Sequence, residues 1–409
     1  MKIILDRNSS KFIFLRALMV RVLALLLVFA FNNVMSDGFV GSTYYYDDYR
    51  YEQGAEAYAK EANSLIDVDA FVSSYASVGD WVGYHLQQNP LTASPLWYWI
   101  VCILLYITKT KWTIRIFNIV AASFAVVYVN KLANKLYGEE TANRATNLLT
   151  YLPYPVFFSC FSYKDTLIMW LTFYLLYNSV CYYKEERLSV KTILLMVVSF
   201  VILFFMRGGV TAILLLLCFY IMFCESLRKT ITPGRLALLC FLLAIVVLIV
   251  YRSMGLIAYK LSYYINRHTE TLGNTTISAL MINSPRDFYK LPIAYLFSVV
   301  MPIGLGTFAN SWYSVIANVN VVMTPIAIGA TFYIFHKKQE SNIYFALLIY
   351  YLIAISTSLN IFRHYYSLIP ISIIGYSDFI TISSEHEKVV SFVLGVLFAI
   401  ALIAFYGFA

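Results

Sequence analysis

Charged residues are scarce in this sequence. Asp, Glu, Lys and Arg together make up 13% of the 409 residues, whereas 60% are apolar and the mean hydropathy is +0.70. This balance excludes a soluble globular protein. Apolar runs of about 17 to 25 residues match helices that rise 1.5 Å per residue through a hydrocarbon layer about 30 Å thick. Because backbone groups in lipid must be hydrogen-bonded within their own segment, these runs are predicted to be helices.

Paired cysteines are also missing. The six cysteines lie in or beside apolar segments, and none forms a Cys-x-x-Cys motif, which excludes a disulfide framework and a zinc site of the usual spacing. We find no internal repeat and no low-complexity tract. The net charge of +8 comes from Lys and Arg in short loops, where they set orientation and contact anionic membrane lipid. Nucleic acid is therefore not an expected partner.

The N-terminal segment resembles a signal peptide but lacks a small-x-small cleavage site, so we interpret it as an uncleaved first span with a cytoplasmic N-terminus. The clear spans are predicted at 11–34, 112–133, 141–162, 166–183, 190–206, 208–224, 235–252, 311–335, 341–361, 365–382 and 389–408. Two shorter stretches, 95–108 and 291–308, fit juxtamembrane or re-entrant helices better than full spans. The chain, 1–409, is thus predicted to be a single all-α polytopic membrane domain with about 11–13 transmembrane helices.

Positive charges orient these spans. If 95–108 does not cross the membrane, nine residues in three later loops all face the cytoplasm: Lys131, Lys135, Arg144, Lys184, Arg187, Lys191, Arg228, Lys229 and Arg235. If it crosses, the same nine face outward, against the positive-inside rule. We prefer the first topology, although it leaves Lys109, Lys111 and Arg115 as exceptions. Most of the reactive side chains then lie on the outer face of what we interpret as a bacterial inner (plasma) membrane.

The first outer loop, 35–94, is acidic and contains a predicted amphipathic helix over 49–66. Apolar residues recur there at helical spacing, with one i,i+4 ion pair beside them: Tyr51, Ala55, Tyr58, Ala62 and Leu65, and the pair Glu56 and Lys60. Just ahead of this helix stand Asp47 and Asp48. An acidic pair at this place either caps the helix, for which Asp is well suited, or serves a site at the membrane surface. The residues alone leave both interpretations open.

Further charged residues lie at predicted outer ends of spans, namely Lys164, Asp165, Arg207, Arg363 and His364. Charged groups near hydrocarbon cost a few kcal/mol unless they are paired or serve a site. Arginine suits phosphate because its planar fork donates two parallel hydrogen bonds and keeps its charge. The alternatives are that Lys164 and Asp165 neutralise each other, that Asp165 caps the next helix, or that the arginines anchor the chain at the interface.

Four features follow one another along the chain: the first span with an outer loop that opens at Asp47-Asp48-Tyr49-Arg50-Tyr51; Asn89-Pro90-Leu91 with Pro95-Leu96; a proline-then-Ser-x-x-x-Lys-Asp boundary that ends at Asp165; and Arg363-His364-Tyr365-Tyr366-Ser367-Leu368-Ile369-Pro370. Together they resemble the GT-C superfamily of integral-membrane glycosyltransferases, and especially its family-39-like bacterial members, which use polyprenyl-phosphate-linked sugars. The sequence differs in having Gln88-Asn89-Pro90-Leu91 where better-known members have His-Pro-Pro or Lys-Pro-Pro. It also has no Trp-Trp-Asp-Tyr-Gly, which argues against an oligosaccharyltransferase.

The resemblance implies transfer of a hexosyl or pentosyl group from a polyprenyl-phosphate donor to a glycan, lipid or protein acceptor on the outer face, in cell-surface polysaccharide or glycoconjugate assembly. It implies Asp48 as the base that takes the acceptor's proton, and Asp47 as its neighbour or as the ligand of a divalent metal ion, the one cofactor it suggests. Cationic groups would stabilise the departing phosphate. The candidates for substrate and lipid-phosphate contacts are Lys164, Asp165, Arg207, Arg363 and His364.

Two other functions stay open. A repeat-unit polymerase of lipid-linked oligosaccharides, of the O-antigen or capsule type, also has many spans and a large outer loop. The corresponding loop here is 253–290, with Lys260, Arg267, Arg286 and Lys290, although such a polymerase is expected to concentrate its charge in later loops. A flippase or polysaccharide-precursor transporter would need ionisable residues in the middle of its spans, and these are scarce here.

Overall fold

The computed structural model describes residues 9–35, 46–77, 95–184, 187–223, 285–300, 320–333, 343–344, 347–351 and 366–408, and all regular structure in this part of the chain is helical. The helices are α1 (Ser10–Met35), α2 (Tyr46–Glu61), α3 (Val68–Ser77), α5 (Pro95–Thr108), α6 (Trp112–Tyr137), α7 (Glu139–Tyr151), α8 (Pro153–Phe158), α9 (Asp165–Tyr183), α10 (Val190–Phe223), α14 (Leu291–Val300), α16 (Thr324–Tyr333), α18 (Ile369–Ile382) and α19 (Glu385–Phe408), with short 3-10 helices at Pro285–Lys290 and Asn320–Met323. The predicted all-α class is confirmed for these residues.

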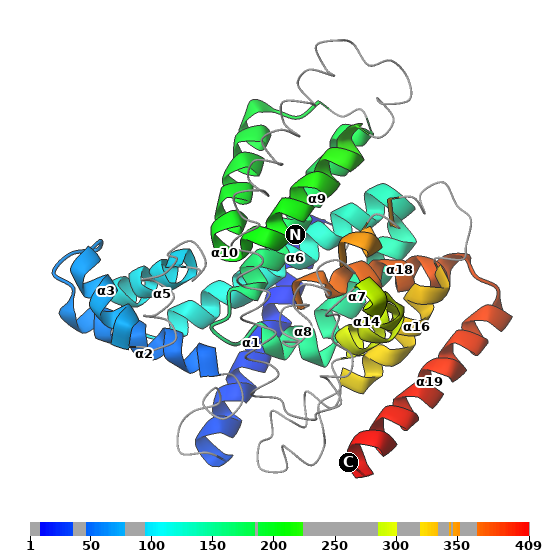
Figure 1. The fold of residues 1–409 in the computed structure, drawn as a ribbon, viewed down its shortest axis with the longest axis horizontal. Helices are drawn as coiled ribbons and strands as arrows, with labels where there is room; N and C mark the ends of the chain where they lie inside the picture. The colour runs from blue at the N-terminus through cyan, green and yellow to red at the C-terminus, as the bar shows by residue number, and fades with distance from the viewer. Residues whose placement is uncertain are drawn as a thin grey trace, which may run out of the picture.

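Helix α6 lies at the centre of the fold (Figure 1) and packs against α1, α7 and α9. Helices α2, α3 and α5 form a group on one side, and α16, α18 and α19 gather on the other. Many residues of α6 itself are buried, and several of these are small: Ala121, Ala122, Ser123 and Ala125. Small side chains let neighbouring helix backbones approach closely. Helix α6 is therefore the element against which both groups are placed.

Helices α2 and α3 form a hairpin, and α2 packs along α5. The turn of the hairpin is fixed by Asp67, whose carboxylate accepts the backbone N–H groups of Ala70 at 3.0 Å and Asn63 at 3.1 Å. These N–H groups hold the pKa of the Asp67 carboxyl below its usual value. The Tyr58 hydroxyl donates to the carbonyl of Leu65 at 3.0 Å and closes the same turn. The amphipathic helix predicted over 49–66 thus exists, but it begins earlier, at Tyr46, and ends at Glu61.

The predicted span 141–162 is not one helix. Helix α7 ends at Tyr151, α8 is only six residues long, and α9 begins at Asp165. Between α7 and α8 the backbone of Leu152 is extended, with φ −61° and ψ 128°, because the ring of the following Pro153 disfavours the helical conformation in the residue before it. The prediction of a continuous span overlooked this effect of the proline.

Two other predicted segments agree with the structure. The backbone of α10 is non-helical at Arg207, with φ −157° and ψ 66°, so two helices meet there, as predicted for 190–206 and 208–224. Helix α5 has 14 residues and is about 21 Å long at 1.5 Å per residue, too short for a full span. Of the stretch 291–308, helix α14 covers Leu291–Val300, and the rest lies outside the described residues.

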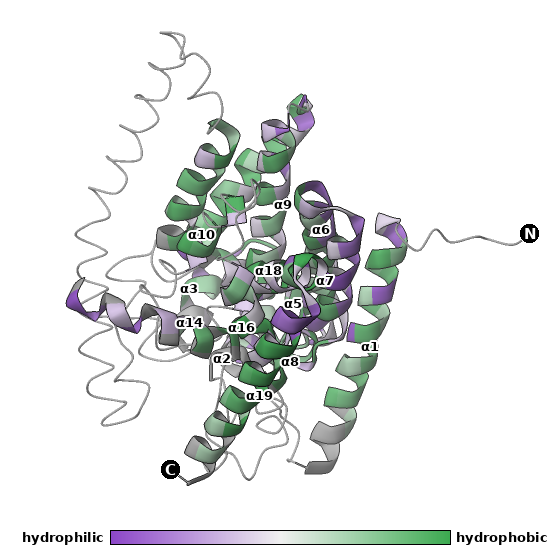
Figure 2. Cartoon of the chain, turned by 90° about the vertical axis from the view of Figure 1, so that its right-hand side faces the viewer, coloured by the Kyte–Doolittle hydropathy of each residue, from purple (hydrophilic) through white to green (hydrophobic). Residues whose placement is uncertain are grey.

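Large apolar side chains cover the outward faces of α1, α10 and α19, which Figure 2 shows as predominantly hydrophobic helices. On α1, Met19, Leu23 and Leu27 follow one another at a spacing of four residues and are 66, 59 and 52% exposed. Exposed apolar rows of this kind mark a surface that is covered by lipid or by another protein. Among the described residues, Trp112–Tyr137 and Val190–Arg207 are long and apolar enough to cross a membrane.

Candidate functional site

A short segment without helical structure, 159–164, joins α8 to α9, and we call it the junction loop. Its residues 159–163 are all buried. A buried irregular segment is stable only if its backbone polar groups find partners, because no bulk water reaches them. Non-helical backbone at membrane depth occurs where it is enclosed by protein or lines a cavity, often at a binding site. The junction loop is therefore a candidate site.

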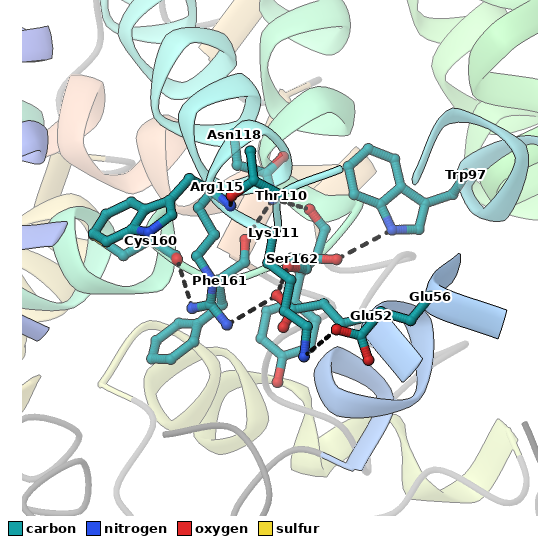
Figure 3. A network of polar contacts seen from close by, with 12 residues as sticks. Glu52, Glu56, Trp97, Thr110, Lys111, Arg115, Asn118, Cys160, Phe161 and Ser162 are labelled. Carbon is teal, nitrogen blue, oxygen red and sulfur yellow. Dashed lines mark hydrogen bonds and ion pairs between the residues drawn. The ribbon is translucent and has the colours of Figure 1, made fainter. Parts of the chain in front are cut away.

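Side chains of α5 and α6 bind four consecutive carbonyl groups of the junction loop (Figure 3). Arg115 Nη1 donates to the carbonyl of Cys160 at 3.2 Å, Asn118 Nδ2 donates to those of Phe161 and, at 2.9 Å, Tyr163, and Trp97 Nε1 donates to that of Ser162 at 3.1 Å. The hydroxyl of Thr166 donates to Asn118 Oδ1 at 2.8 Å, which fixes the orientation of the amide. Side-chain donors thus replace the amide donors that a helix would have supplied.

A fully buried arginine supports the break ahead of α8. Pro153 has no N–H group, so the carbonyl of Leu149, four residues earlier, lacks its helical donor. Arg21 on α1 supplies one instead, because its Nη2 lies 3.1 Å from that carbonyl, while its Nη1 donates to the carbonyl of Ala17 at 3.2 Å. Arg21 is 0% exposed. Helix α1 therefore completes the hydrogen bonding that the proline removed from α7.

Glu52 connects α2 to the junction loop. Its Oε1 lies 2.8 Å from Arg115 Nη2 and also accepts the hydroxyl hydrogen of Ser162. The side chains of Glu52 and Arg115 are 0 and 3% exposed, so this ion pair is shielded from water. Glu56, one turn later on α2, forms an ion pair with Lys111 at 2.9 Å. It does not pair with Lys60, so the predicted i,i+4 pair is wrong. Two successive carboxylates of α2 thus hold the hairpin against the start of α6.

Lys164, Asp165 and Arg207 come together, although the last is more than 40 residues away in sequence. Arg207 Nη2 lies 3.1 Å from Asp165 Oδ1, and Lys164 Nζ donates to the carbonyl of Met206 at 3.3 Å. The alternative that Lys164 neutralises Asp165 is therefore wrong. So is the alternative that Asp165 caps α9, because it lies in the first turn of this helix rather than at its N-cap. Two cationic side chains and one carboxylate are thus gathered where two helix breaks meet.

The structure describes less of the other predicted site residues, Asp47, Asp48, Arg363 and His364. Helix α2 begins at Tyr46, so Asp47 and Asp48 belong to its first turn, and the prediction that they stand ahead of the helix as caps is wrong. Position 48 is four residues before Glu52, which puts both on one face of α2, about one turn apart. The side chains of Asp47 and Asp48 lie outside the described residues, and so do Arg363 and His364 entirely.

Sequence reasoning missed the residues that hold the junction loop: Glu52, Trp97, Arg115 and Asn118. One signal was available for Glu52, because it lies three residues before Ala55, within the predicted amphipathic helix, at the edge of the apolar face. Arg115 was treated as an exception to the charge rule, yet it is 3% exposed and paired. Asn118 carried no signal, since a single amide in an apolar helix does not indicate its partner.

The charged side chains of the described site suit an anion better than a metal ion. Glu52 and Asp165 each face an arginine, whereas a divalent metal ion needs several oxygen ligands that are free to coordinate it. Within the described residues, no three His, Cys, Asp or Glu side chains gather as a metal-binding group. The prediction that Asp47 holds a metal concerns a side chain outside the described set.

Comparison of the chain with protein families, with curated proteins and with solved structures finds no match.

Proposed function

We propose that this protein is a polytopic membrane glycosyltransferase that moves a sugar from a polyprenyl-phosphate donor to an acceptor on the outer face of the membrane. One observation carries the proposal: Lys164 and Arg207, each at a break between helices, stand next to each other beside the loop on which the acidic helix α2 is anchored. Cationic groups and a docked acidic helix at one membrane face are the parts that the GT-C resemblance implies.

The membrane setting is supported by the outer surface of the bundle. Apolar rows on α1, α10 and α19 are exposed, and a soluble protein of this size rarely exposes contiguous apolar patches of such extent. Arg115 and Tyr137 lie 22 residues apart on α6, about 33 Å at 1.5 Å per residue, which is close to the thickness of the hydrocarbon layer. The junction loop, next to Arg115, would then lie near one membrane surface, and in the preferred topology this is the outer one.

The cationic pair suits the phosphate of the donor. Arg207 is 12% exposed and Asp165, its partner, 2%, so the guanidinium lies beside a buried carboxylate at a partly open place. A planar guanidinium donates in parallel to two phosphate oxygens, and the Lys164 ammonium adds a point charge. Such groups stabilise the negative charge that grows on the phosphate as the sugar leaves, which is the larger part of the catalysis that this site would supply.

The proposed reaction needs one base. Asp48 takes the proton of the acceptor hydroxyl while that oxygen forms a bond to the anomeric carbon of the sugar, and the bond from this carbon to the phosphate oxygen breaks, so polyprenyl phosphate leaves. Glu52 is a positioning residue. Its pairing with Arg115 and Ser162 fixes α2 against the junction loop, which sets the place of position 48 one turn earlier.

The test is an assay for release of polyprenyl phosphate from a panel of polyprenyl-phosphate sugars in membranes that contain the full-length protein. Arg207→Gln and Asp48→Asn should each reduce release by roughly 100-fold or more, because they remove a phosphate contact and the base. Arg144→Gln is the matched control, since Arg144 forms an exposed pair with Glu140 near the opposite end of α6.

Three outcomes contradict the proposal. Normal release by Asp48→Asn and Asp47→Asn would show that α2 carries no base. If polyprenyl-diphosphate-linked oligosaccharide is supplied instead, release of polyprenyl diphosphate together with a ladder of products would indicate the repeat-unit polymerase. Translocation of the lipid without release of either product would indicate a flippase.

A further inference from the structure

A second polar centre lies at the other end of α6 from the junction loop, about 33 Å away along the helix. It is built around Asp378 on α18, which is 3% exposed and lies against the start of α7. The hydroxyl of Thr141 donates to Asp378 Oδ1 at 2.9 Å and also lies 3.4 Å from Thr381 Oγ1. Nothing in the proposed transfer reaction uses these residues.

The second oxygen of this carboxylate lacks a hydrogen bond of normal geometry. Asp378 Oδ2 is buried and makes no hydrogen bond, and Asp378 forms no salt bridge with any described residue. The Tyr333 hydroxyl interacts with Asp378 and with Tyr137, yet it too is buried and lacks the geometry of a normal hydrogen bond. The Tyr137 and Tyr333 rings meet edge to face, with centroids 6.1 Å apart. Burying a carboxylate oxygen without a partner is costly, so this arrangement calls for a positively charged ligand.

We propose that Asp378, Thr141, Tyr333 and Tyr137 form a binding site for a monovalent cation. Every atom that would coordinate the cation is an oxygen, and oxygen ligands favour a hard cation over a transition metal. Among the described groups at this place only one is a carboxylate, and the others are neutral hydroxyls. One negative charge balances one positive charge, whereas Ca²⁺ or Mg²⁺ sites draw on more carboxylates or on substrate phosphates. The cation would cross-link α6, α7, α16 and α18, and its role is independent of sugar transfer.

If this site binds a cation, the thermal stability of the protein should depend on the concentration of that cation. The melting temperature of the purified full-length protein in detergent is measured in NaCl and in choline chloride at equal ionic strength, because choline is too large for a buried oxygen site. The wild-type protein should melt at a temperature that rises with NaCl concentration and then saturates, as expected when a ligand binds only the folded state. Asp378→Asn should lose this rise, and Asp287→Asn, which breaks an ion pair with Lys290 elsewhere, should keep it.

Asp378→Asn could fail to fold, so two milder variants accompany it. Thr141→Val and Tyr333→Phe each remove one oxygen and keep the shape of the side chain, and each should raise the NaCl concentration at half-saturation by about tenfold or more. Equal melting temperatures of the wild type in NaCl and choline chloride would overturn the proposal.

Discussion

The buried pair of Glu52 and Arg115 gives the sharpest test of how α2 is held. Glu52→Gln keeps the size of the side chain and leaves an amide oxygen that can still accept from Ser162. It removes the negative charge that faces Arg115 at 2.8 Å. Arg115 cannot turn toward water, because its side chain is 3% exposed and its other nitrogen donates to the carbonyl of Cys160. The variant therefore takes away the carboxylate that faces a buried guanidinium.

The size of the effect follows from this burial. Removing one member of a buried ion pair costs about 3–5 kcal/mol of unfolding free energy, and we expect about 3 kcal/mol because the amide oxygen keeps part of the interaction. Glu52→Gln combined with Arg115→Met removes the stranded charge and, among the described partners, leaves the carbonyl of Cys160 without its donor, at about 1–3 kcal/mol. The double variant should therefore be no less stable than Glu52→Gln alone, although it carries one more substitution.

The assay is denaturant-induced unfolding of the purified protein in detergent, followed by tryptophan fluorescence. Glu56→Gln is the control, because it breaks the pair with Lys111, whose two side chains are 42 and 32% exposed, and such exposed pairs contribute about 0–1 kcal/mol. If Glu52→Gln unfolds at the same denaturant concentration as Glu56→Gln, the buried pair does not hold α2. A double variant that is far less stable than Glu52→Gln would also refute the reasoning.

Three further outcomes are expected. Arg21→Met should lose about 1–3 kcal/mol in the same unfolding assay, because the carbonyl of Leu149 is left without a donor. In intact cells, a membrane-impermeant thiol reagent should label a cysteine placed at Asp69 but not one at Arg187; labelling of the second would invert the preferred topology. The pKa of Asp67 is lowered in the folded hairpin, so its contribution is present above the unfolded value near ~3.9 and is lost as pH falls through the folded value. The protection of the α3 amides, relative to their intrinsic exchange rate at the same pH, should accordingly fall at acidic pH, and the fall should be smaller in Asp67→Asn.

The helices were predictable where the apolar pattern is long and uninterrupted. The segment 112–133 corresponds to most of α6, and 166–183 corresponds to α9 almost residue for residue. The break at Arg207 was also predictable, because an arginine followed by two glycines interrupts an apolar run. The prediction failed at Pro153, where hydropathy continues across a residue that cannot donate a backbone hydrogen bond. Apolar content alone does not report that loss.

The site was predictable in part. Lys164, Asp165 and Arg207 were singled out because charge is rare near apolar spans, and the structure brings these three together. The sequence does not show which carboxylate forms an ion pair with which arginine, because the partners come from helices that are distant in the chain. Glu52 was one of nine acids in the first outer loop, and only the docking of α2 on α5 separates it from the other eight.

The hydrogen bond from Arg21 to the carbonyl of Leu149 also sets an order of assembly. Its two ends are 128 residues apart, so α7 is synthesised long after α1. Until α1 is in place, the end of α7 exposes a carbonyl that its own helix cannot satisfy. Helix α1 thus acts as a template on which the later segment closes. A chain that lacks residues 9–35 would lack Arg21, and the carbonyl of Leu149 would lose the donor that replaces the missing N–H of Pro153.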